Sequence, residues 1–211
     1  VSALQFDVTT ADASLAAGQY VYFRQLVEAQ NLQHLQYGTA NAKTITLSFW
    51  VKSNKTGTYC AGIVKSDATA YKIFDEYTIS SADTWEQKKI TFTPTAGSTS
   101  LITGAGGIIN NDNDLGFEVQ FGLAWGSTFG SGTPQTWSTS SAYYASTNQV
   151  NWMDSTSNNF YLTGVQLELG SNATPYEHRS YGDELARCSR YFQKYGEDGA
   201  TSGMSLTAMN T

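Results

Sequence analysis

The residues best suited to chemistry in this sequence are aromatic rings concentrated between positions 125 and 152. Sugars present apolar C–H faces that pack against such rings, and nearby amide or carboxylate groups can bind sugar hydroxyls. Trp125 continues the apolar alternation of its segment, which assigns it to the core. For the other rings, core packing and subunit contact remain open interpretations. The candidate glycan contacts are Trp137, Tyr143, Tyr144, Asn151, Trp152 and Asp154.

The sequence contains few of the residue patterns that catalysis requires. His34 and His178 are the only histidines, neither lies in a metal-binding spacing, and no GxSxG or P-loop motif occurs. The two carboxylates of a glycosidase could still meet in space, although each acidic residue also fits an outward strand position or a turn. We therefore expect no enzymatic activity and no cofactor. The acidic residues considered are Asp75, Glu76, Glu118, Asp154, Glu168 and Glu177.

Metal and disulfide chemistry are equally weakly indicated. Residues 110–114, with the sequence NNDND, offer oxygen ligands for calcium but also have the composition of an ordinary turn. Cys60 and Cys188 are the two cysteines, too few for a disulfide framework, so we expect two reduced thiols. The sequence therefore predicts no bound metal.

Composition limits the class of protein. Charged residues make up 14% of the 211 residues and the net charge is -6, which argues against binding a phosphate backbone. No apolar run approaches the ~20 residues that a membrane span requires. The absence of an initiator methionine and the polar C-terminal end suggest a fragment or processed product that more chain originally followed. The length fits one large β domain with an appendage.

Alternating apolar residues predict the strands that must position these side chains. The alternation is clearest over residues 44–52 and 115–125, where every second side chain is apolar, and Trp50 departs from it by facing outward. Residues 149–170 are interpreted as two adjacent strands joined by a turn, with a register shift near Gly164. About nine short strands favour an all-β, two-sheet antiparallel sandwich. Further strands are expected at residues 19–27, 58–64, 71–79 and 85–93.

The character of the sequence changes after Pro175. Asp183 can cap a helix that Gly196 would end, and apolar residues recur at helical intervals between them. So short a helix needs a partner, either the sandwich or a neighbouring subunit. We expect a sandwich over residues 1–176, a junction and helix over 177–196, and a linker or the start of another module over 197–211. The candidate interface residues are Leu185, Arg187, Cys188 and Phe192.

Four segments in the C-terminal third carry a resemblance to a known group of proteins. QVNWMDST, FYLTGVQLELG, ATPYEHR and YGDELARCSRYFQK, in this order, are similar to the closing segment of bacteriophage tail-fibre and virion proteins, and the similarity extends over residues 15–195. It implies a jelly-roll sandwich like that of carbohydrate-binding or galactose-binding modules. Such jelly rolls often keep an acidic residue near a structural calcium, where this chain has Thr163 and Gly164.

The resemblance also implies a role. It indicates a non-enzymatic virion component, assembled in the host cytoplasm and acting outside the cell, in host-surface attachment or particle architecture. The implied partners are other virion proteins, further copies in a homotrimer, and a host-surface glycan. The alternative is a carbohydrate-binding module of a secreted polysaccharide-degrading enzyme.

Overall fold

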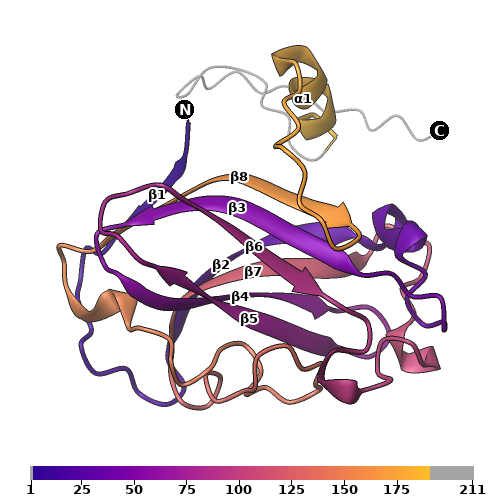
Figure 1. Ribbon diagram of the computed structural model, residues 1–211, viewed down its shortest axis with the longest axis horizontal. Coiled ribbons are helices and arrows are strands. Elements are labelled where there is room, and N and C mark those ends of the chain that lie inside the picture. Colours follow the sequence, from indigo (N-terminus) through magenta and orange to yellow (C-terminus); the bar gives the residue numbers. More distant parts are fainter. Residues whose placement is uncertain (1, 191–211) are drawn as a thin grey trace, which may run out of the picture. The chain divides into compact units, whose positions relative to one another are not determined.

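The computed structural model describes residues 2–190 and shows two four-stranded antiparallel sheets packed as a sandwich (Figure 1). The strand order is β1-β8-β3-β6 in one sheet and β2-β7-β4-β5 in the other, which is the order of a jelly roll. The strands are β1 (Leu4–Asp7), β2 (Tyr20–Glu28), β3 (Ile45–Ser53), β4 (Gly57–Lys65), β5 (Tyr71–Ile79), β6 (Glu86–Phe92), β7 (Leu115–Trp125) and β8 (Asn159–Leu169). Short 3-10 helices are η1 (Ala29–Leu35), η2 (Ala96–Ser98), η3 (Ala105–Gly107) and η4 (Trp152–Asp154).

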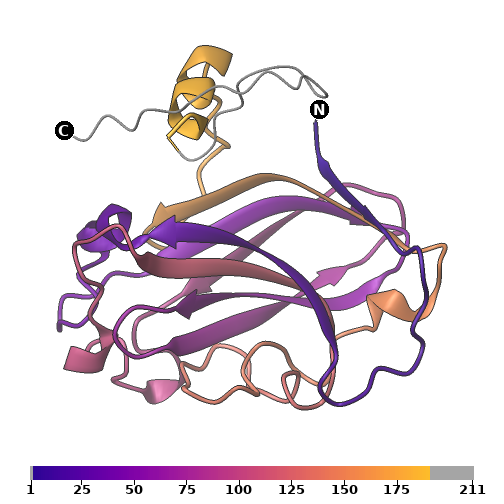
Figure 2. The same ribbon diagram turned by 180° about the vertical axis from the view of Figure 1, so that it is seen from behind.

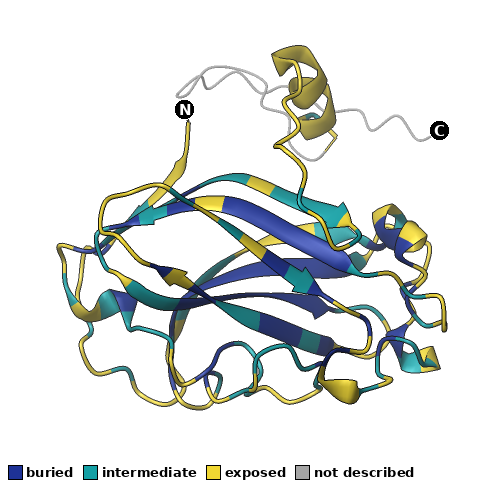
Figure 3. Ribbon diagram, in the orientation of Figure 1, coloured by how far each residue is buried: buried dark blue, intermediate teal, exposed yellow. Residues whose placement is uncertain are grey.

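Aromatic side chains from both sheets form the core between them. Figure 3 shows that buried residues lie along the strands of both sheets. The Phe6 ring of β1 stacks on the Phe23 ring of β2 at 4.6 Å, and Phe49 of β3 meets Phe121 of β7 edge-on at 5.0 Å. Because alternate residues of each strand point inward, one sheet supplies one wall of the core and the second sheet the other. The predicted all-β sandwich is therefore confirmed.

One predicted strand is wrong. The first half of residues 149–170 forms the 3-10 turn η4, and only the second half forms a strand, β8. The Asn151 side chain accepts a hydrogen bond from the Met153 amide at 2.9 Å and so caps this turn. Such a local side-chain bond competes with strand pairing, which explains why an extended segment does not form here. The short strand β1 was not expected.

The register shift predicted near Gly164 is confirmed. Ser48 of β3 pairs with Gln166, but Trp50 pairs with Thr163, so β8 contains one extra residue at this point. Gly164 has φ of 58°, a conformation that glycine adopts without steric cost. Phe160 before the bulge lies in the core, whereas Val165 within it is exposed.

The chain divides into two compact units, Val1–Tyr176 and Glu177–Thr211, which are described separately. In the second unit, α1 spans Tyr181–Cys188 and begins at Ser180, whose hydroxyl accepts a hydrogen bond from the Asp183 amide at 3.2 Å. Asp183 is therefore a first-turn residue and not the cap that we predicted. Within the described residues the helix ends before Ser189. Leu185, Arg187 and Cys188 are exposed, and the remaining interface candidate, Phe192, lies outside the described residues.

Both cysteines of the chain are free thiols, as expected, with Cys60 buried and Cys188 exposed. No helix within residues 2–190 combines the length and the hydropathy needed to cross a membrane.

Candidate functional site

A β-bulge in β7 turns Trp125 out of the core and begins the candidate site. Val21 of β2 pairs with Ala124, but the next residue, Tyr22, pairs with Gly122, so Leu123 is an extra residue in the ladder. An extra residue reverses the alternation beyond it. Leu123 therefore stays in the core while Trp125 joins Gly122 on the outer face of the β2-β7-β4-β5 sheet. The prediction that Trp125 belongs to the core is wrong for this reason.

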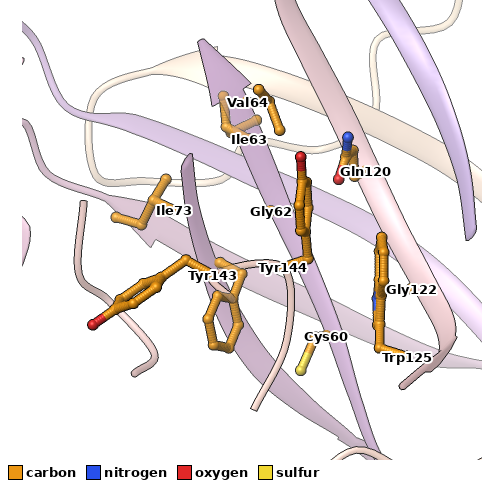
Figure 4. Close-up of a pocket in the computed structure, with 11 residues that line it drawn as sticks. Cys60, Gly62, Ile63, Val64, Ile73, Gln120, Gly122, Trp125, Tyr143 and Tyr144 are labelled. Atoms are coloured by element: carbon orange, nitrogen blue, oxygen red, sulfur yellow. The ribbon is translucent and has the colours of Figure 1, made fainter. Parts of the chain in front are cut away.

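Three aromatic rings form a continuous stack on this outer face. Trp125 stacks on Tyr22 with ring centroids 5.0 Å apart and 21° between planes, and on Tyr144 at 5.0 Å and 14°. Figure 4 shows the Trp125 and Tyr144 rings lying nearly parallel beside the backbone of β4 and β7. Tyr20 and Phe129 extend the group, meeting edge-on at 5.2 Å. We call Tyr22, Trp125 and Tyr144 the aromatic stack.

A glycine allows the stack to lie against the sheet. A methyl group at Gly122 would lie 2.1 Å from Trp125 Nε1, so the indole occupies the space that a side chain would fill. Only a cavity of ≈ 10 Å³ lies under the rings, about the room that one water molecule needs. Trp125 Nε1 and both polar atoms of the Gln149 side chain are buried there without a hydrogen-bond partner. The stack is thus held in place by packing.

The loop over residues 126–150 delivers Tyr144 to the stack. It runs beside β5 (Figure 2), where Ser138 exchanges two backbone hydrogen bonds with Lys72, at 2.8 and 2.9 Å. The Gln135 amide donates to the Phe74 carbonyl at 2.8 Å, and the Tyr144 amide donates to the Phe129 carbonyl at 3.2 Å. These bonds fix the loop backbone at Tyr144 and at two positions before it.

Polar side chains lie next to the stack on the same face. Arg24 Nη1 donates to Glu118 Oε2 at 2.9 Å, and Gln120 Nε2 donates to the same oxygen at 2.8 Å. Arg24 pairs with Gln120 across β2 and β7, and Lys72 pairs with Val64 across β5 and β4, so all these side chains share one face. The hydrogen bond and charge of Glu118 raise the pKa of Arg24. We call Arg24, Lys72, Glu118 and Gln120 the polar cluster.

Lys72 joins the stack to the cluster. Its ammonium nitrogen lies 5.4 Å from the centroid of the Tyr144 ring, within the range of a cation–π interaction. Burial lowers the pKa of Lys72, and the charge of Glu118 opposes this shift. Burial also raises the pKa of the Tyr144 hydroxyl. Half-buried charge and aromatic surface therefore meet at one place.

Two tryptophans predicted to contact a ligand lie in the core. Trp137 is 1% exposed and donates its indole N–H to the Thr93 carbonyl at 2.9 Å. Trp152 is 2% exposed and donates to the Asn159 carbonyl at 3.1 Å. Their rings have no surface left for a sugar, so the structure supports the packing interpretation for both.

The other four predicted contacts are divided among different places. The Asn151 amide donates to the Asp12 carbonyl at 2.7 Å, and Asp154 pairs with Lys55 at 2.6 Å, the main cause of its lowered pKa. Tyr143 packs beside a small group containing Cys60 and points away from the stack (Figure 4). Of the six predicted contacts, Tyr144 alone belongs to the stack.

Sequence reasoning missed most of this face. The usable signal was in residues 20–24, where Tyr20, Tyr22 and Arg24 share one parity and so must share one face of a strand. The alternation of residues 115–125 likewise predicted that Glu118 and Gln120 face away from the core.

The acidic residues considered for catalysis each have a partner of their own. Glu118 binds Arg24, Glu76 accepts from Asn148 at 3.0 Å, and Glu168 accepts from Thr174. In the candidate turn at 110–114, Asp112 accepts a hydrogen bond from the Asp114 amide at 3.1 Å, as in an ordinary turn. Within residues 2–190, no three His, Cys, Asp or Glu side chains come together in a way that could hold a metal ion.

No protein-family model and no curated protein matches the sequence. Among solved structures, a chain described as "Family 16 Carbohydrate Binding Module-2" is similar to this one over 73% of each chain, with 18% sequence identity and a TM-score of 0.30.

Proposed function

We propose that this protein is a non-enzymatic carbohydrate-binding β-sandwich whose ligand lies on the outer face of the β2-β7-β4-β5 sheet. The observation that carries the proposal is the aromatic stack with the polar cluster beside it. The stacked rings offer apolar surface for the C–H groups of a sugar, while Arg24, whose side chain is 45% exposed and is held by the buried Glu118, offers donors for its hydroxyls.

The site suits binding because it is already assembled. Tyr22 and Trp125 lie on adjacent paired strands, and the Tyr144 backbone is hydrogen-bonded into its loop, so little ordering is needed when a ligand arrives. Glu118 Oε2 accepts from Gln120 and from Arg24, which orients the exposed Arg24 side chain for recognition. Glycoside hydrolysis requires a pair of carboxylates on either side of a scissile bond, whereas the aromatic stack and the polar cluster contain one, that of Glu118.

The test is binding to a panel of soluble polysaccharides by affinity electrophoresis, comparing Trp125→Ala with wild type. We expect a loss of about 30-fold, the scale of an aromatic hot spot. Trp85→Ala is the matched control, because Trp85 is exposed on the other sheet. Thermal unfolding of each variant checks that it is folded. Wild-type binding to no polysaccharide, or equal losses in the two variants, would refute the proposal.

We further propose a setting, a bacteriophage particle in which this module serves host-surface attachment or architecture. The support is the set of four sequence segments that resemble the closing segment of virion proteins. Mass spectrometry of purified particles should find the chain as a stoichiometric component. Recovery of the chain from a secreted polysaccharide-degrading enzyme would instead support the alternative that it is that enzyme's binding module.

A homotrimer, with other virion proteins as partners, is the assembly that this setting favours. The exposed Leu185 on α1 is an apolar group that a subunit contact would cover. Sedimentation equilibrium of the full chain should give three times the monomer mass, and Leu185→Asp should shift it toward monomer, while Leu185→Met should not. A monomer in the wild type would refute the trimer. A trimer that binds no polysaccharide would favour a purely architectural role.

A further inference from the structure

We propose that the carbohydrate bound by this face is acidic, and that Lys72 and Arg24 bind its carboxylates. This inference rests on the proposed function, and it names the class of sugar for the same site.

Lys72 is the first support. It is half buried, and among the described residues its ammonium group takes part in no ion pair, since Glu118 binds Arg24 and the other four salt bridges lie elsewhere. Taking an ammonium group partly out of water is costly unless an anion or acceptor replaces the lost hydration. Its pKa is lowered by burial, as expected for a charge with too little compensation. A ligand carboxylate would supply the missing partner.

The position of Lys72 is fixed, which favours a specific contact. Its backbone pairs with Val64 of β4 on one side and with Ser138 of the loop on the other. The Tyr144 ring lies within 5.4 Å of the ammonium group. The lysine head is thus held beside the aromatic stack, where a sugar ring would lie.

Arg24 is the second support. One of its N–H groups binds Glu118, and its side chain remains exposed, so the rest of the guanidinium fork is accessible. Since a guanidinium binds carboxylates through two parallel hydrogen bonds, an arginine oriented in this way is suited to a second anion. Glu118 is close to both cations, because it binds Arg24 and its charge opposes the lowering of the Lys72 pKa. Glu76 lies on the same face but binds Asn148, and it is four positions along β5 from Lys72, about 13 Å.

The test uses polyuronates before and after chemical reduction of their carboxyl groups, which yields neutral polymers with the same sugar stereochemistry. The probes are polygalacturonate, polyglucuronate and polymannuronate, each measured against its reduced form. We expect reduction to weaken binding at least tenfold for a polymer that the wild type binds. Lys72→Met should abolish this preference, and Arg24→Gln should diminish it.

Controls separate the inference from the function on which it rests. Lys89→Met removes an equal charge from the other sheet, and this variant should still prefer the acidic polymer. Trp125→Ala should bind neither the acidic polymer nor its reduced form. If the wild type binds the neutral polymers as tightly as the acidic ones or more tightly, and Trp125→Ala weakens that binding, the inference of an acidic ligand is wrong and the proposed function stands. A preference that Lys89→Met reduces as much as Lys72→Met reflects nonspecific charge and also overturns it. Binding of no polysaccharide at all overturns both.

Discussion

The outer faces of the two sheets both carry aromatic rings and a lysine, but they are built differently. On the β1-β8-β3-β6 sheet, Trp50 and Trp85 are 39% and 38% exposed, and Lys52 lies between Trp85 and Tyr161, at 5.5 and 4.3 Å from their ring centroids. On the β2-β7-β4-β5 sheet the rings stack on one another, and the lysine lies at the end of the row. Lys52 fills the space between its rings, whereas Lys72 leaves its stack intact.

The difference shows that exposure alone does not identify a binding face. On the face that carries Trp50 and Trp85, the segment after β8 is held by side-chain hydrogen bonds of Thr174 with Gln166 and Glu168, whereas residues 126–150 fix Tyr144 through backbone hydrogen bonds. Trp125 is less exposed than Trp50 or Trp85, yet it is placed by a bulge, a glycine and two flanking tyrosines. Preorganisation lowers the entropic cost of binding, so the less exposed face is the better candidate.

The largest expected effect is a difference in polysaccharide affinity between substitutions of one tyrosine on each outer face. Tyr144→Ala removes the loop's contribution to the aromatic stack and should weaken polysaccharide binding about 30-fold. Tyr161→Ala, on the other sheet, should change it less than about twofold. Isothermal titration calorimetry of both variants measures the ratio. If Tyr161→Ala weakened binding more than Tyr144→Ala, the ligand would bind the outer face of the β1-β8-β3-β6 sheet instead.

A smaller effect should follow from Gly122→Ala. The added methyl group displaces the Trp125 indole, so we expect binding to fall roughly fivefold. Gly18→Ala is the control, since a methyl group there meets no atom within 4 Å. Calorimetry measures the affinity of each variant, and denaturant unfolding measures its stability. A loss of binding in Gly122→Ala with unchanged stability would identify displacement of the Trp125 ring as the cause. An unaltered affinity would show that the indole does not need to lie against the sheet.

The interior side of the same sheet should make stability depend on pH. Lys65 is 0% exposed, donates to the Gly106 carbonyl at 2.8 Å, and burial lowers its pKa from 10.5 to about 8. Between pH 8 and 9 the unfolded chain holds this proton more tightly than the folded protein, so the free energy of unfolding should rise, on the order of 1 kcal/mol. Above pH 9 the rise should end and give way to a decline, because burial raises the pKa of Cys60 and of Tyr59 to about 12 and the unfolded chain releases those protons first.

Urea titrations at each pH measure this profile. Lys65→Met should remove the rise between pH 8 and 9 and leave the decline at higher pH. A rise of the same size in Lys65→Met would assign the effect to another group.

The smallest effect concerns Lys52. Lys52→Met removes its cation–π contacts with Trp85 and Tyr161, and we expect a loss of about 0.5 kcal/mol in unfolding free energy. Polysaccharide affinity should not change. New binding in this variant would mean that the lysine had been blocking a second sugar surface on the β1-β8-β3-β6 sheet.

The sequence was sufficient for most of the fold because the strands are long and regular. The alternation in residues 115–125 predicted β7 with its observed bounds, and the inward residues Phe117, Val119 and Phe121 are buried as expected. The bulge at Gly164 was predicted because two apolar runs of opposite parity had to face one core. Where the period is clear, geometry follows from the pattern.

The candidate site was harder to predict because it depends on departures from that pattern. Leu123, Ala124 and Trp125 are all apolar, so the bulge that reverses their alternation leaves no trace in hydropathy. Trp137 and Trp152 lie in irregular segments, where no period tells a buried ring from an exposed one. Tyr144 was among the predicted contacts, but its partners come from strands distant in sequence.

The loop that carries Tyr144 also closes an open edge of the sandwich. β5 is the last strand of its sheet, and unpaired edge strands invite other chains to add on and aggregate. The bonds from Gln135 and Ser138 to this strand occupy groups that would otherwise be available to such a chain. Protection of this edge and the proposed ligand recognition therefore depend on one segment. Sequence changes in the loop that alter recognition without exposing the edge should leave the backbone bonds of Gln135 and Ser138 in place.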